Sequence, residues 1–226
     1  MSILDRIFGT PEERKANGLL KKVKAETSEV YGPLSNLGLG IVRAAWDSYQ
    51  DLAKVLELSV GGQPTKQQML LFYELLYFFI HVTIRTAVGH GLTEAQISKI
   101  QDYLGPQLSR TAVDTFCRHW PIELKKRIAH EFFAKLNDAE VEYSKCRALM
   151  LKDESFENDS LFGKLSHNVA QLWGSPSNPV VIMAAKTSAT KAFTSMPLDK
   201  LIHDVAIVID RVEPDTLAAL RDRPWS

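Results

Sequence analysis

The chain has few cysteines: its 226 residues include two, Cys117 and Cys146. Two cysteines are too few for a disulfide framework, and these two lack the spacing of a metal site. A chain of this length buries about 70% of its unfolded surface when it folds as one domain, so it needs no crosslinks. We therefore expect two reduced thiols in a cytoplasmic protein.

The chain also lacks an excess of charge of either sign, because 27 Lys and Arg balance 27 Asp and Glu. A protein that binds a phosphate backbone needs a positive surplus to release counterions, so we expect no nucleic-acid partner. Disorder is excluded as well, because hydrophobic residues make up 45% of the chain and a disordered segment would be depleted in them.

Long hydrophobic runs are scarce. The N-terminus has no extended apolar stretch, and we therefore expect no signal peptide. The most apolar segment covers residues 69–84 and contains Glu74 and His81. As a helix it would span about 24 Å, which is short of a hydrocarbon core of about 30 Å. We interpret this segment as a buried core helix, and we expect no membrane span.

Catalytic and cofactor motifs are missing too. Residues 130–134 read HEFFA, which begins like a zinc-protease motif but has Ala134 where the second histidine should stand. No His follows a Glu by three positions, as a di-iron helical bundle requires. Residues 32–40 contain a short Gly-x-Gly without the third glycine of a dinucleotide site. We therefore expect no metal and no cofactor, and the absence of these motifs favours a non-enzymatic protein.

Helix start signals, by contrast, are plentiful. Thr65 to Gln68 and Thr93 to Gln96 have the form of capping boxes, and Asn178-Pro179 places a capping residue before a proline. Apolar residues between such signals recur at helical spacing. The pattern predicts a single all-α domain of eight or nine helices, over residues 10–29, 38–58, 66–88, 94–104, 107–119, 121–151, 160–173, 179–194 and 197–212, with a helical turn after Pro214.

Residues 1–30 form a candidate N-terminal arm, separable from an all-α domain over 31–226. Ile3, Leu4, Ile7 and Phe8 would form a small apolar face on one helical turn. Such a face can dock onto a partner protein or a membrane surface. The alternative is an N-terminal helix that lies on the bundle and buries this face there.

A narrow polar stripe marks the apolar helix predicted over 66–88. Glu74, His81 and Arg85 fall within about 40° of one another around its axis, and Tyr77 flanks them. Three interpretations are open: an exposed edge, a buried ion network, or a ligand site in an internal cleft. In a cleft the histidine would have a shifted pKa, and the charged groups would need partners.

Two functions compete at this point. The first is a protein-interaction or self-assembling module, which the missing catalytic motifs favour. The alternative is a small-molecule-binding or enzymatic helical bundle, in which Glu74, Tyr77, His81 and Arg85 line an internal cleft. Burial of the stripe discriminates between the two, since a site must face a cavity and not bulk water.

Overall fold

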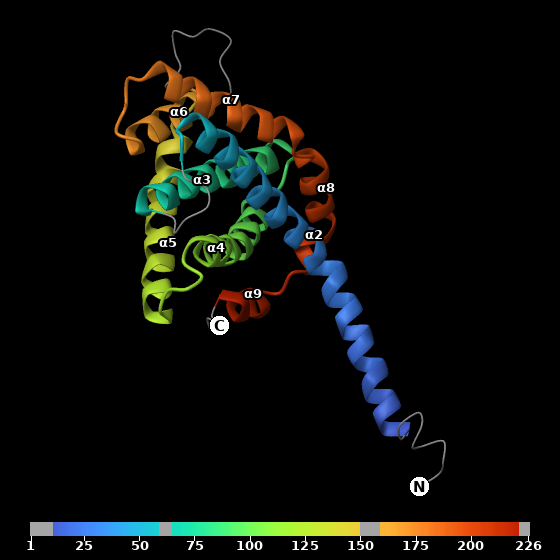
Figure 1. Ribbon diagram of the computed structural model, residues 1–226. Helices are drawn as coiled ribbons and strands as arrows, with labels where there is room; N and C mark the ends of the chain where they lie inside the picture. Colours follow the sequence, from blue (N-terminus) through green and yellow to red (C-terminus); the bar gives the residue numbers. More distant parts are fainter. Residues whose placement is uncertain (1–10, 59–64, 150–158, 222–226) are drawn as a thin grey trace.

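The computed structural model describes residues 11–58, 65–149 and 159–221. In these residues the chain forms eight α-helices, one short 3₁₀ helix and no strand, which confirms the predicted single all-α domain. Figure 1 shows the α-helices α2 (Pro11–Val55), α3 (Lys66–Gly89), α4 (Glu94–Phe116), α5 (Ile122–Ser144), α6 (Leu161–Leu172), α7 (Pro179–Ser195), α8 (Leu198–Val208) and α9 (Pro214–Arg221). The 3₁₀ helix η2 (Ile209–Arg211) lies between α8 and α9.

The predicted capping residues begin their helices as expected. The Thr65 side chain accepts a hydrogen bond from the Gln68 amide, and the Gln68 side chain accepts one from the Thr65 amide at 2.7 Å. Thr93 and Gln96 form the same reciprocal pair at the start of α4. Each pair satisfies backbone donors that a helix end would otherwise leave without partners.

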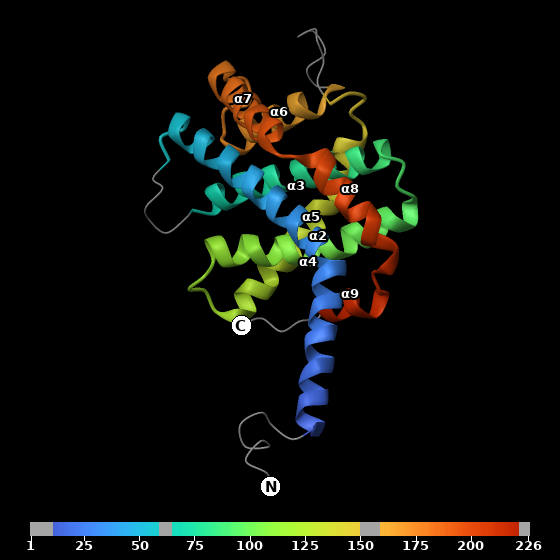
Figure 2. The same ribbon diagram turned by 90° about the vertical axis from the view of Figure 1, so that its right-hand side faces the viewer.

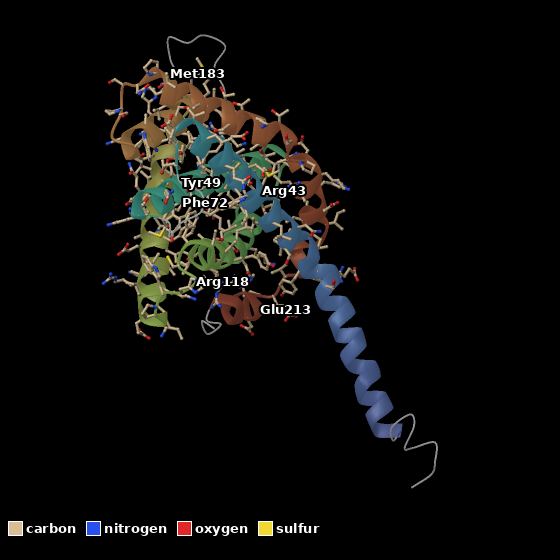
Figure 3. The ribbon with its side chains drawn as sticks, viewed as in Figure 1. Arg43, Tyr49, Phe72, Arg118, Met183 and Glu213 are labelled. Atoms are coloured by element: carbon tan, nitrogen blue, oxygen red, sulfur yellow. The ribbon has the colours of Figure 1, made fainter. Side chains whose placement is uncertain are left out.

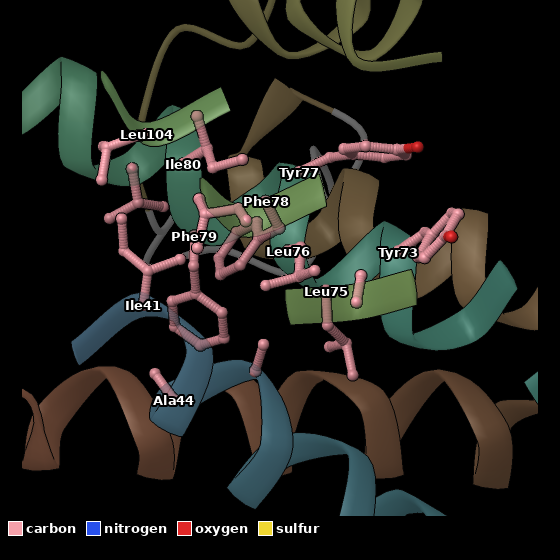
Figure 4. Close-up of a cluster of buried hydrophobic side chains, with 14 of the residues drawn as sticks. Ile41, Ala44, Tyr73, Leu75, Leu76, Tyr77, Phe78, Phe79, Ile80 and Leu104 are labelled. Atoms are coloured by element: carbon pink, nitrogen blue, oxygen red, sulfur yellow. The ribbon is translucent and has the colours of Figure 1, made fainter. Parts of the chain in front are cut away.

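Helix α3 lies at the centre of the domain and contacts α2, α4, α5, α6 and α8. Its apolar side chains point in several directions around the helix (Figure 4), and most are fully buried. Within the described residues, α3 is the helix long and apolar enough to cross a membrane, but 67% of its most apolar window is buried inside the protein. A helix that is apolar nearly all round is usually central in its domain.

Helix α2 packs across α3 and against α7 and α8. An aromatic cluster joins α2, α3 and α4: the ring centroids of Tyr49 and Phe72 lie 6.0 Å apart, and those of Phe72 and Phe116 lie 5.0 Å apart. Figure 3 labels Tyr49 and Phe72 in the interior of the bundle. Offset and edge-to-face aromatic pairs of this kind add stability beyond their buried area.

The predicted helix breaks near residue 33 and at Gly105-Pro106 are wrong. Pro33 lies inside α2 and Pro106 lies inside α4. A proline inside a helix removes one hydrogen bond and costs about 3 kcal/mol. That cost is offset because the buried stripe of each helix continues across its proline: Val30, Leu34, Leu37, Ile41, Ala45, Tyr49 and Leu52 in α2, and Ile100, Leu104, Leu108, Ala112 and Phe116 in α4.

The first turns of α2 project from the rest of the bundle in both views (Figures 1 and 2). The helix is continuous from Pro11 to Val55, so no break in secondary structure marks residue 30 as a boundary. The separation of residues 1–30 from the domain stays a prediction.

Candidate functional site

A pocket of about 310 Å³ opens between α3, α4 and α5. This volume is at the lower end of the range of small-molecule sites, which runs from about 300 to 1,000 Å³. Its apolar wall comes from all three helices and consists of Tyr77, Ile80, Ile84, Leu104, Phe133 and Leu136. Helix α3 therefore presents one face to a cavity, while its other faces pack in the core.

Gly105 and Pro106 shape the α4 side of the pocket. A Cβ atom at position 105 would lie 3.1 Å from Cε1 of Phe133, which is tighter than ordinary van der Waals contact. The glycine thus allows the phenyl ring of α5 to approach the α4 backbone closely. Pro106 has no N–H, so the carbonyl oxygen of Asp102, four residues earlier, lacks its regular helical donor.

Polar side chains complete the pocket: His81 from α3, Gln101 and Asp102 from α4, and Asn137 and Glu140 from α5. Gln101 Nε2 donates a hydrogen bond to Glu140 Oε1 at 2.8 Å and so connects α4 to α5. The carboxylate side chains of Asp102 and Glu140 are both exposed to solvent. The pocket therefore combines an apolar wall with an acidic polar rim.

His81 is partly buried, and its ring centroid lies 5.7 Å from that of Tyr143. Burial lowers the pKa of His81 to about 4, and the positive charge of Arg85 acts in the same direction. A group with a pKa of about 4 is uncharged near neutral pH, so His81 presents a neutral imidazole to the pocket. A neutral imidazole has one N–H donor and one acceptor nitrogen.

Tyr77 lines the pocket, but its hydroxyl is already engaged in a hydrogen bond. Its hydroxyl donates a hydrogen bond to the Phe132 carbonyl of α5 at 3.2 Å. Burial raises the pKa of Tyr77 well above its usual value, so the hydroxyl keeps its proton. Tyr77 therefore contributes an aromatic surface and ties α3 to α5.

Glu74 lies outside the pocket, in a polar cluster between α3, α5 and α6. Its Oε1 accepts hydrogen bonds from the Tyr143 hydroxyl at 2.6 Å and from Asn168 Nδ2 at 2.7 Å. Burial raises the pKa of Glu74, and these two hydrogen bonds oppose that increase. The arrangement is that of a structural network, in which both donors satisfy a carboxylate that is partly removed from water.

Arg85 is also absent from the pocket lining. Its Nη2 donates a hydrogen bond to the Arg147 carbonyl at 3.1 Å, and its Nη1 is buried without a hydrogen-bond partner. The polar stripe predicted from the sequence is thus divided: Tyr77 and His81 face the pocket, whereas Glu74 and Arg85 each make a separate contact with a later part of the chain.

Sequence reasoning missed the residues that α4 and α5 contribute: Gln101, Asp102, Phe133, Asn137 and Glu140. They lie on helices that become neighbours of α3 only in the folded domain. A local signal is present at Gly105-Pro106, which the sequence pattern predicts to be a helix break. A glycine next to a proline inside an otherwise continuous helical stripe can also mark a place where another element or a ligand approaches the backbone.

The remaining predictions concern the N-terminal docking face, metal binding and the two cysteines. Ile3, Leu4, Ile7 and Phe8, the predicted docking face, lie outside the described residues. Within the described part of the chain, no three His, Cys, Asp or Glu side chains are grouped closely enough to hold a metal ion. Cys117 and Cys146 are both free and buried.

Comparison with known proteins gives no further guidance. No protein-family model, no curated protein and no solved structure matches this chain. Any function proposed for this protein must therefore follow from the geometry and chemistry of its own residues.

Proposed function

We propose that the protein binds a small organic molecule in the pocket between α3, α4 and α5. The observation that carries this proposal is the combination of an apolar, partly aromatic wall with a polar rim in one concavity. Small-molecule sites have this composition, because the apolar wall supplies affinity and a few placed polar groups supply orientation. The proposal adopts the ligand-binding alternative of the sequence analysis.

The neutral state of His81 supports this role. A charged group in the wall would have to be desolvated each time an apolar ligand entered, at a cost in free energy. His81 is uncharged near neutral pH because its pKa lies at about 4. The imidazole can therefore exchange a hydrogen bond with a ligand without this penalty.

The surface of the described residues offers less support for a protein-interaction role. Its large exposed apolar side chains are spread over several helices, for example Leu39 on α2, Val88 on α3, Met183 on α7 and Ile207 on α8. Single exposed apolar residues are common on monomeric proteins and need no partner to explain them. Self-association stays a prediction that light scattering can test.

Filling the pocket is expected to weaken ligand binding strongly. The neutral probe 2-naphthylmethanol should bind the wild-type protein at a single class of sites, as followed by ligand-observed NMR titration. Leu136→Trp places an indole in the apolar wall and is expected to weaken binding by at least about tenfold, which corresponds to 1.4 kcal/mol. Asn137→Trp, at an exposed position of the rim, should have the same effect without disturbing the core.

The matched control is Val141→Trp, because Val141 lies on the same helix, is 58% exposed and does not line the pocket. This variant should bind the probe as the wild-type protein does. All three variants should keep a helical circular dichroism spectrum and a cooperative thermal transition. Equal binding by Asn137→Trp and Val141→Trp would rule out this pocket as the site.

A further inference from the structure

We infer that the ligand of this pocket is an organic cation, with an ammonium group at the acidic rim and an apolar body against the wall of α3, α4 and α5. This inference rests on the proposed function and specifies the class of ligand. It follows from the charges at the rim, the hydrogen-bonding groups around it and the aromatic rings of the wall.

The charges at the rim have one sign. Asp102 on α4 and Glu140 on α5 line the pocket, and among its described lining residues there is neither Lys nor Arg. Arg85, one turn beyond His81 on α3, does not line the pocket and donates to the carbonyl of Arg147, so its charge acts on His81 but stands outside the rim. A cation at the rim would meet two carboxylates, whereas an anion would be repelled by both of them.

The hydrogen-bonding groups around the rim are mainly acceptors. Two of the donors are already used, since Gln101 donates to Glu140 and Tyr77 donates to the Phe132 carbonyl. The carboxylates of Asp102 and Glu140 and the side-chain oxygen of Asn137 add acceptors to the lining. An ammonium group carries three donors and no acceptor, so it complements this arrangement better than a carboxylate or a phosphate does.

The wall also favours a positive charge. Tyr77 and Phe133 contribute aromatic rings to the pocket, and an aromatic face attracts a cation through its quadrupole. Figure 4 shows Tyr77 and Ile80 extending from α3, with Leu104 of α4 close to Ile80. The same wall can therefore hold an apolar body and stabilise a charge attached to it.

Three probes with one skeleton test the inference: 2-naphthylmethylamine, 2-naphthylmethanol and 2-naphthoate, titrated near neutral pH at low ionic strength. We expect the amine to bind more tightly than the alcohol and the carboxylate to bind most weakly. Each solvent-exposed carboxylate should contribute about two- to fivefold to the preference for the amine. Added salt should reduce this preference, because these charges are screened.

Variants assign the preference to the rim. Glu140→Gln and Asp102→Asn should each reduce the advantage of the amine over the alcohol, and the double variant should abolish it while the alcohol binds as before. Asp138→Asn is the control, because Asp138 is an exposed acid on α5 that does not line the pocket. It should leave the advantage intact.

The outcomes of these titrations distinguish an error in the ligand class from an error in the proposed binding site. If the carboxylate binds as tightly as the amine, or if the advantage of the amine survives in the double variant, the inference about a cation is wrong while the pocket stands. If Asp138→Asn lowers the advantage as much as Glu140→Gln does, the effect is one of net charge and the inference is again wrong. If neither the amine nor the alcohol binds, the proposed function itself is wrong.

Discussion

Acidification from pH 6.5 to pH 4 should destabilise the wild-type protein by up to about 3 kcal/mol relative to His81→Gln. The pKa of His81 is lowered from 6.5 to about 4 in the folded protein, and each pKa unit corresponds to 1.36 kcal/mol. Below pH 6.5 the unfolded chain binds a proton that the folded protein does not bind. The free energy of unfolding must therefore decrease as the pH is lowered, until His81 is also protonated in the folded state.

Urea unfolding of both proteins at several pH values from 4 to 7.5 measures this effect. The comparison isolates His81, because the groups around it, which are Arg85, Asp102, Glu140 and Tyr143, are present in both proteins. Glu74 contributes with the opposite sign, since its pKa is raised on folding. The contribution of Glu74 to stability is lost as the pH rises above 4.5. Because Glu74 is present in both proteins, this loss cancels when the free energies of unfolding of the wild-type protein and His81→Gln are subtracted. A constant difference across the range would contradict the burial of His81.

Removal of the Tyr143 hydroxyl should have the second-largest effect. Tyr143→Phe is expected to lower the free energy of unfolding by about 1.5–3 kcal/mol near neutral pH, the usual range for a hydrogen bond to a charged group. The reason is that the fully buried Tyr143 donates to the partly buried carboxylate of Glu74 at 2.6 Å. Urea denaturation measures the change, with the same m-value (the slope of free energy against urea concentration) used for both proteins.

The chain offers a close control for this experiment. The Tyr73 hydroxyl is also buried but has no hydrogen-bond partner, so Tyr73→Phe should change stability by less than about 0.5 kcal/mol or increase it. In a Glu74→Gln background, Tyr143→Phe should cost only about 0.5–1.5 kcal/mol, because the remaining hydrogen bond is between neutral groups. If Tyr143→Phe lowers the free energy of unfolding equally in the wild-type protein and in Glu74→Gln, the charge of Glu74 does not strengthen the hydrogen bond of Tyr143.

Much of the fold could be predicted from local patterns. Capping boxes at Thr65 and Thr93 and the helical spacing of apolar residues were sufficient to place most helices, because both signals depend on residues within a few positions of one another. The breaks predicted at residues 30–37 and at Gly105-Pro106 are wrong because they give glycines and prolines more weight than the apolar stripe that continues across them. Burial of these stripes outweighs the local cost of the proline. The helix predicted over 121–151 is too long as well, since α5 ends at Ser144.

The candidate site could be predicted only in part. Tyr77 and His81 stand out in an apolar helix, and they do line the pocket. The rest depends on which helices become neighbours, and the sequence has no local signal for that. The partners of Glu74 show the difficulty, since Tyr143 and Asn168 lie 69 and 94 residues away in the chain. The division of the stripe between a pocket and a structural network follows from these distant contacts.

Chemical-shift mapping of 2-naphthylmethylamine on the methyl-labelled protein tests the ligand pocket most directly. The probe should shift the methyl signals of Ile80, Ile84, Leu104 and Leu136, which come from three helices and line one cavity. Methyl groups buried elsewhere in the core, such as those of Val181 and Leu198, should keep their positions. Shifts confined to other residues, or none at saturating probe, would contradict the assignment of this pocket as the binding site.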